Sequence, residues 1–166
     1  MEIAEDRLIK LSECEAKRSY ITIEMDGKPF KVRTYVIGDI TDGKKTLVIL
    51  HGRAGFGTQY FNIWKELSQR YRLIFFDNLG WGLNTRLQGC SGTESPEAAE
   101  QWIIDWILKT FEALDLPPKF LLAGKSYGGW LASLYASFHP EKVEALFLIS
   151  PAGTEAYNEE TYDPYN

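Results

Sequence analysis

Cysteine is nearly absent from this sequence: Cys14 and Cys90 are the only two among 166 residues. Two isolated thiols form neither a disulfide framework nor a metal site, so both are expected to be reduced, and no metal or other cofactor is expected. An excess of basic residues is missing too, because 18 Lys and Arg face 23 Asp and Glu, which gives a net charge of −5. This charge opposes attraction to phosphate backbones, so nucleic-acid binding is not expected.

Long apolar runs are also missing. The first residues lack the basic start and apolar core of a signal peptide, and no uncharged run approaches the roughly 18 residues of a membrane-spanning helix. The sequence therefore predicts a cytoplasmic protein.

The sequence does contain enough apolar residues for a hydrophobic core. Hydrophobic residues make up 45% of it and aromatic residues 14%, which at this length is typical of one packed globular domain.

Strand and helix patterns alternate along the chain. Residues 20–25 and 30–35 alternate in polarity around a turn at 26–29 and predict an antiparallel hairpin. Short apolar runs then predict strands that are covered on both faces of a parallel sheet, at 46–50, 73–76, 120–123 and 145–150. Helical spacing lies between them, at 60–71, 96–114 and 127–138.

These elements predict an α/β fold, in which βαβ units of a mostly parallel sheet follow an N-terminal hairpin. We expect an N-terminal extension at 1–17 and the core at 18–153. Residues 154–166 are rich in Glu, Tyr and Asn. We interpret them as the start of a lid or an unstructured tail.

One short motif carries the chemistry. Gly124, Ser126 and Gly128 form a Gly-x-Ser-x-Gly pattern between a predicted buried strand and a predicted helix. That setting is typical of a nucleophile elbow, in which small residues allow a strained turn that exposes the serine hydroxyl. The helix that follows offers free N–H groups and a positive dipole end to a developing oxyanion.

A second loop, residues 51–57, follows an earlier strand and is called the oxyanion loop below. A glycine-bearing loop of this kind can present a second backbone N–H to a tetrahedral oxygen, and we nominate Arg53, with Ala54 as the alternative. For His51 we favour a structural role over a catalytic one. Asp77, at the end of another strand, either orients a histidine or, as we favour, caps its own loop by binding backbone N–H groups.

Taken together, these pieces resemble the α/β-hydrolase superfamily, over about residues 18–155 and the first six of the family's eight strands. The motifs that carry the resemblance are His51-Gly52-x-x-Gly55, Phe76-Asp77-x-x-Gly80-x-Gly82, Gly124-x-Ser126-x-Gly128-Gly129, His139-Pro140-Glu141-x-Val143 and Leu148-Ile149-Ser150-Pro151-Ala152-Gly153. Within the superfamily, the chain is most similar to the branch that contains lysophospholipases, lysophosphatidic acid acyltransferases and the lipid-droplet co-activator of triglyceride lipase.

The resemblance implies that Ser126 is the nucleophile and that the N–H groups of Tyr127 and Arg53 form the oxyanion hole, with His51 in the oxyanion loop. Lys125 is a departure, because histidine is more frequent before the nucleophile in this branch. Its cation either depresses the serine pKa or extends into solvent.

A larger departure concerns the rest of the catalytic triad. In this family an acid and a histidine follow the nucleophile, after the seventh and eighth strands. Here the only later histidine is His139. It lies at the far end of the same predicted helix, about 20 Å away, so it cannot be the base. We expect an incomplete fold that lacks the last two strands and most of the lid, and whose sixth strand is an exposed edge needing the C-terminal half or a partner.

Two functions follow as hypotheses. The first is a serine hydrolase or acyltransferase that acts on carboxylic esters, with lipid acyl esters as substrates and peripheral contact with a membrane or lipid droplet. The alternative is a non-catalytic, hydrolase-like module for lipid binding or co-activation, which the absent base favours. Haloperoxidase or peptidase chemistry also stays open, because the fold does not fix the substrate.

Overall fold

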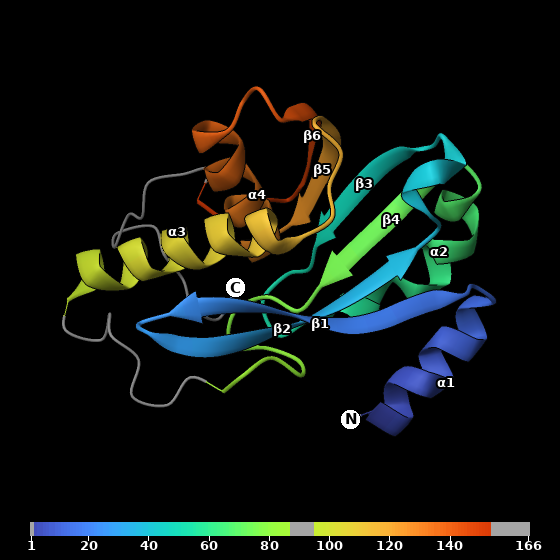
Figure 1. Cartoon of the computed structure of the whole chain (residues 1–166), viewed down its shortest axis with the longest axis horizontal. Helices are drawn as coiled ribbons and strands as arrows, with labels where there is room; N and C mark the ends of the chain where they lie inside the picture. The colour runs from blue at the N-terminus through green and yellow to red at the C-terminus, as the bar shows by residue number, and fades with distance from the viewer. Residues whose placement is uncertain (1, 87–94, 154–166) are drawn as a thin grey trace, which may run out of the picture.

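A six-stranded sheet organises the chain, and helices cover both of its faces (Figure 1). The structure is a computed structural model that describes residues 2–86 and 95–153. The strands in chain order are β1 (Ala16–Met25), β2 (Lys28–Ile37), β3 (Lys45–Leu50), β4 (Tyr71–Phe76), β5 (Phe120–Lys125) and β6 (Val143–Ile149). The helices are α1 (Glu2–Ser12), α2 (Phe61–Ser68), α3 (Pro96–Ala113) and α4 (Tyr127–Phe138), with short 3₁₀ turns at η1 (Ile40–Asp42) and η2 (Gly57–Tyr60).

The strand order is β1-β2-β4-β3-β5-β6. β1 pairs antiparallel with β2, and β2 antiparallel with β4, while the remaining pairs are parallel. This arrangement confirms the predicted hairpin followed by βαβ units. Because β4 and β5 flank β3 on opposite sides, the direction of winding switches at β3. In open α/β sheets, ligand sites form at the carboxyl ends of the strands beside such a switch.

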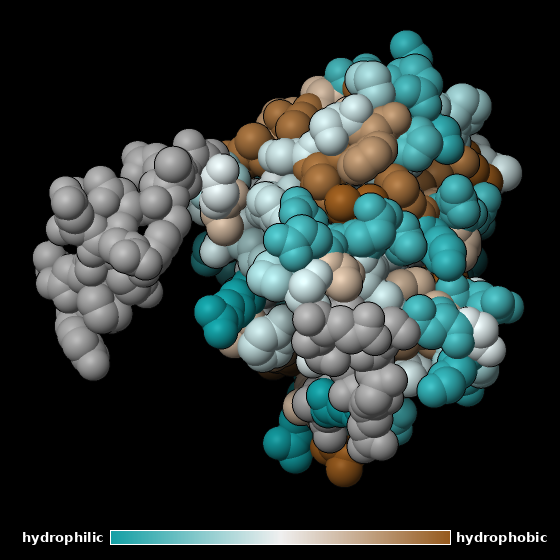
Figure 2. Space-filling model, turned by 90° about the vertical axis from the view of Figure 1, so that its left-hand side faces the viewer, coloured by the Kyte–Doolittle hydropathy of each residue, from teal (hydrophilic) through white to brown (hydrophobic). Residues whose placement is uncertain are grey.

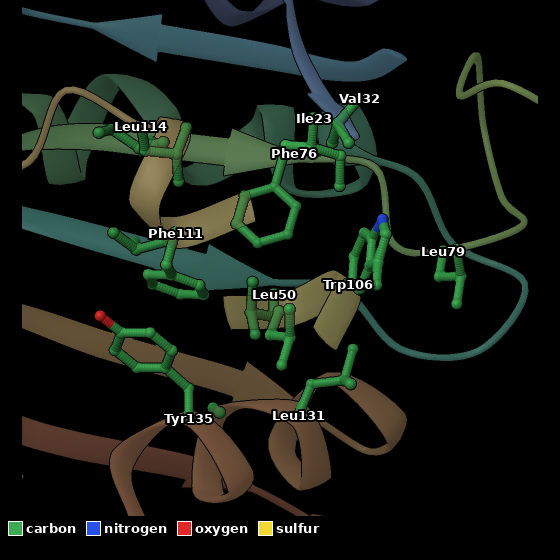
Figure 3. Close-up of a cluster of buried hydrophobic side chains, with 14 of the residues drawn as sticks. Ile23, Val32, Leu50, Phe76, Leu79, Trp106, Phe111, Leu114, Leu131 and Tyr135 are labelled. Carbon is green, nitrogen blue, oxygen red and sulfur yellow. The ribbon is translucent and has the colours of Figure 1, made fainter. Parts of the chain in front are cut away.

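Side chains on the central strands alternate between two buried layers. Phe76 of β4 faces α3 and α4, where Phe111 lies between Phe76 and Tyr135, with ring centroids 5.7 Å and 3.9 Å away (Figure 3). Its neighbour Phe75 faces the other side and packs against Trp64 of α2 at 5.1 Å. Burial on both faces explains why these strands are short continuous apolar runs rather than alternating ones.

The start of α3 is confirmed at the predicted place. Ser95 is the N-cap, its hydroxyl accepts the N–H of Ala98 at 3.2 Å, and Pro96 occupies the first helical position. Proline costs little there because that N–H has no intrahelical partner.

Helix α1 was not predicted as a helix. It buries Glu5, whose carboxylate accepts hydrogen bonds from the Arg33 guanidinium at 2.8 Å and from the Tyr35 hydroxyl, while Ile3 and Leu11 are exposed. A helix that docks through a carboxylate does not display the apolar stripe from which helices are predicted. α1 lies within the stretch predicted as an N-terminal extension. β1 begins slightly before the expected core boundary, and the boundary itself stays a prediction.

The sixth strand is the predicted exposed edge. β6 ends the strand order, and its side chains are among the most exposed large hydrophobic groups of the described chain, with Phe147 at 52% and Ile149 at 53%. In Figure 2 apolar side chains gather in the upper part of the molecule, at the height of α4 and β6 in Figure 1. The predictions for Cys90 and for 154–166 lie outside the described residues, whereas Cys14 is a free thiol.

Across residues 2–86 and 95–153, none of the helices combines the length and the apolar character needed to cross a bilayer.

Candidate active site

Ser126 occupies a sharp turn between β5 and α4. Its φ of 51° and ψ of −121° are unfavourable for a residue with a Cβ atom, so the backbone here is strained. The flanking glycines make the turn feasible. A Cβ on Gly124 would lie 2.2 Å from the carbonyl oxygen of Gly128, closer than any real contact. The local sequence therefore gives the geometry of a nucleophile elbow.

The backbone of Ser126 is held from several directions, whereas its hydroxyl is not. The Ser126 N–H donates to the Ile149 carbonyl at 3.0 Å, and the Ser126 carbonyl accepts the N–H groups of Gly129, Trp130 and Ala152 at 2.8, 3.1 and 3.0 Å. The side chain is half-buried, and its hydroxyl makes no hydrogen bond with any described residue. The oxygen that would react is thus unengaged on a fixed support.

The oxyanion loop lies against this elbow. A Cβ on Gly52 would lie 3.4 Å from the Cβ of Ser126, which is van der Waals contact. Arg53 and Ala54 follow in an exposed turn, with Ala54 at a φ of 60°, and the Gly55 N–H closes the turn on the Gly52 carbonyl at 3.1 Å. Within the described residues, the N–H groups of Arg53 and Tyr127 donate no hydrogen bond.

His51 uses both of its ring nitrogens within the protein. Its Nε2 accepts the N–H of Asn78 at 2.7 Å, so Nδ1 carries the hydrogen and donates to the Gly52 carbonyl at 2.7 Å. Burial lowers the pKa of His51 to about 4, although the hydrogen bond to Gly52 acts in the opposite direction. A neutral imidazole with both nitrogens engaged offers no base to Ser126.

Asp77 caps its loop. Its carboxylate accepts the N–H of Gly57 at 2.6 Å and the N–H of Leu83 at 2.7 Å, and it binds no histidine. Burial raises the pKa of the Asp77 carboxyl to about 6, although these two hydrogen bonds act to lower it. The favoured capping interpretation is confirmed.

The other histidine is remote from the elbow. His139 follows the last residue of α4 and contacts Glu141 and the ring of Tyr135, whereas Ser126 precedes the first residue of that helix. Lys125 is exposed, which agrees with the alternative in which its side chain extends into solvent. Among the described residues, no group of three His, Cys, Asp or Glu is arranged to hold a metal ion.

Comparisons with known proteins identify the family of the chain. Residues 45–165 match the family described as the alpha/beta hydrolase fold. Over 119 residues the chain is 39% identical to a 1-acylglycerol-3-phosphate O-acyltransferase of Arabidopsis thaliana, covering 71% of this chain and 28% of that protein. Over 124 residues it is 33% identical to a human (lyso)-N-acylphosphatidylethanolamine lipase, covering 74% of this chain and 35% of that one.

A solved structure shares the fold. Naproxen esterase from Bacillus subtilis superposes with a TM-score of 0.73 at 22% identity, covering 91% of this chain and 48% of the esterase. The chain thus spans about a third or less of these two curated relatives and about half of this structural neighbour. With the sheet order, the elbow and the family match in agreement, the chain belongs to the α/β-hydrolase family.

Proposed function

We propose that Ser126 is the nucleophile of a serine hydrolase or acyltransferase that acts on carboxylic esters. The observation that carries this proposal is the strained backbone of Ser126. Its hydroxyl is unengaged, and the N–H groups of the next residue, Tyr127, and of Arg53 in the adjacent loop donate no hydrogen bond within the described residues. Strain at a residue with a Cβ is typical of functional sites, where the rest of the fold over-determines the conformation.

In the proposed reaction, Ser126 Oγ bonds to the ester carbonyl carbon, and the N–H groups of Tyr127 and Arg53 bind the resulting oxyanion. Collapse of the tetrahedral intermediate expels the alcohol and leaves an acyl-enzyme, which passes the acyl group to water or to another alcohol. The chain contains two histidines: His51 has both ring nitrogens engaged, and His139 lies at the opposite end of α4 from Ser126. In this proposal a histidine outside these 166 residues accepts the Ser126 hydroxyl proton and returns it to the leaving alcohol.

The substrate class is proposed from the relatives. The plant relative is an acyltransferase for a 1-acylglycerol-3-phosphate and the human one a lipase for an N-acylphosphatidylethanolamine, so a lipid acyl ester is the substrate we propose. Contact with a membrane or lipid droplet from the cytoplasmic side belongs to the same proposal. The exposed side chains of β6 give the chain apolar surface for such contacts or for a partner.

A second candidate is a non-catalytic lipid-binding or co-activator module. It is favoured by the state of the histidines, because His51 is neutral and fully engaged and His139 lies at the opposite end of α4.

A fluorophosphonate probe separates the two candidates. We expect the 166-residue chain to be labelled slowly, because an oxyanion hole without a complete triad still leaves roughly 10³-fold catalysis over water. Labelling should disappear in Ser126→Ala and persist in Ser137→Ala. Ser137 is a matched control, since it lies on α4 and its hydroxyl only bonds the Leu134 carbonyl. An unlabelled but folded wild type, verified by circular dichroism, would favour the non-catalytic module.

A further inference from the structure

Two neighbouring residues that follow β4 hold both ends of the oxyanion loop. At the first end, Asn78 donates its backbone N–H to His51 Nε2 at 2.7 Å and its side-chain Nδ2 to the His51 carbonyl at 2.5 Å. At the other end, the Gly57 N–H donates to Asp77 Oδ1 at 2.6 Å. The exposed turn at Arg53 and Ala54 therefore lies between two loop ends that are held by the buried residues Asn78 and Asp77, called the anchors here.

The anchors are themselves tied to the sheet. Asn84 donates its Nδ2 to the carbonyls of Asp77 and Asn78 at 2.7 and 3.0 Å, and its Oδ1 accepts the N–H of Arg33 in β2 at 2.8 Å. Through Asn84, strand β2 thus fixes the backbone of Asn78, which follows the neighbouring strand β4.

A continuous set of contacts leads from Asn78 to the nucleophile. Because Asn78 donates to Nε2, the hydrogen of the neutral His51 ring must lie on Nδ1, which holds the carbonyl of Gly52. Gly52 in turn packs against Ser126. Arg53, the next residue, carries the nominated oxyanion donor.

We propose that Asn78 is a positioning residue that, through His51, sets the place of the Arg53 N–H relative to Ser126. The inference rests on the proposed function. Asn78 is fully buried and touches no reacting atom, so it acts only through the loop. A displacement of about 1 Å in such a site can reduce rate about 100-fold, because an oxyanion donor must meet the developing charge closely.

The Asn78 side chain carries an energetic cost of its own in the folded chain, which bears on how a variant at this position is interpreted. Its Oδ1 is buried without a hydrogen-bond partner among the described residues. Asn78→Ala removes this unsatisfied atom, and it also removes the Nδ2 contacts with the His51 carbonyl at 2.5 Å and with His51 Nδ1 at 3.5 Å. The backbone N–H of residue 78 still donates to His51 Nε2, so the variant tests the hold of the side chain on the His51 carbonyl. Because the backbone bond is kept, we expect a fold close to that of the wild type and an effect concentrated on the loop.

The test measures fluorophosphonate inactivation of the whole chain at several probe concentrations. In Asn78→Ala we expect the maximal inactivation rate constant to fall about 10- to 100-fold while the concentration for half-maximal rate changes less than about twofold. Asn62→Ala is the matched control, since Asn62 is exposed on α2 and should label like the wild type.

A second readout does not depend on catalysis. Hydrogen exchange of the hydrogen-bonded loop amides of Gly55 and Gly57 should accelerate at least about tenfold in Asn78→Ala, with α3 unchanged. Nitrogen NMR of the wild type should find the His51 proton on Nδ1. The inference would be overturned if the wild type is labelled but hydrogen exchange in the loop is unchanged in Asn78→Ala. It would also be overturned if the His51 proton is found on Nε2. The ring-nitrogen measurement needs no variant. A wild type that is not labelled at Ser126 would instead refute the proposed function, and the exchange data would still report on Asn78.

Discussion

Replacing Gly128 with alanine is expected to destabilise the folded chain by roughly 3 kcal/mol or more. Alanine normally stabilises a helical position relative to glycine, by about 1 kcal/mol. Here the sign reverses, because the added Cβ would lie 2.4 Å from the His51 carbonyl oxygen and 2.5 Å from that of Leu50. Both obstacles are backbone atoms at the end of β3, so neither can rotate away. The first turn of α4 would have to separate from the sheet.

Denaturant unfolding of the variant measures this effect, and Gly27→Ala is the control. Gly27 has a φ of 68°, but a methyl group added to it would meet nothing within 4 Å, so alanine there meets only the left-handed backbone penalty, about 1–2 kcal/mol. If Gly128→Ala were no less stable than Gly27→Ala, the close approach of α4 to the end of β3 would be wrong. Loss of fluorophosphonate labelling should accompany the destabilisation, because Gly128 lies two residues after Ser126.

Acidification is expected to shift the stabilities of His51→Gln and Asp77→Asn in opposite directions relative to the wild type. The pKa of His51 is lowered from 6.5 to about 4, so between these values the unfolded chain binds a proton that the folded chain does not. The His51 contribution to stability therefore falls as the pH drops through this window. The pKa of Asp77 is raised from 3.8 to about 6, so its contribution rises as the pH drops from about 6 to 4.

The two contributions nearly cancel in the wild type, and single variants should reveal them. Between pH 7 and pH 4.5, His51→Gln should gain roughly 2 kcal/mol relative to the wild type, whereas Asp77→Asn should lose roughly 2 kcal/mol. The measurement is the free energy of unfolding of all three proteins at both pH values, since groups common to them drop out of the differences. Parallel pH profiles would show that neither residue titrates abnormally.

The fold was largely predictable because its central strands are buried on both faces. Runs such as 46–50 and 73–76 leave little choice, since a continuous apolar run of that length fits a covered parallel strand. The hairpin extends further than predicted, to Ala16–Met25 and Lys28–Ile37, because the outer residues of β1 face solvent and show no apolar alternation. Helix α1 escaped prediction for a related reason, as its buried anchor is Glu5 rather than an apolar stripe.

The candidate site was predictable in part. The elbow is a local feature, so the spacing of Gly124, Ser126 and Gly128 between strand and helix was sufficient to predict its geometry. The hold that Asn78 has on His51 joins residues 27 apart in sequence and was missed. A signal existed, because β3 and β4 were predicted as parallel strands, and the residues that follow such strands meet at the same edge of the sheet. The roles of Ser126, Tyr127, Arg53 and His51 stay predictions.

The three N–H groups that meet at the Ser126 carbonyl have a consequence for entropy. They come from the first turn of α4 and from the segment after β6, so the peptide plane of the serine cannot tilt without disturbing both. The hydroxyl oxygen retains one freedom, rotation about Cα–Cβ among three staggered positions, and selecting one of them costs at most about 0.7 kcal/mol. Nearly all of the conformational entropy that must be lost to place this oxygen is thus lost during folding, before any carbonyl carbon binds.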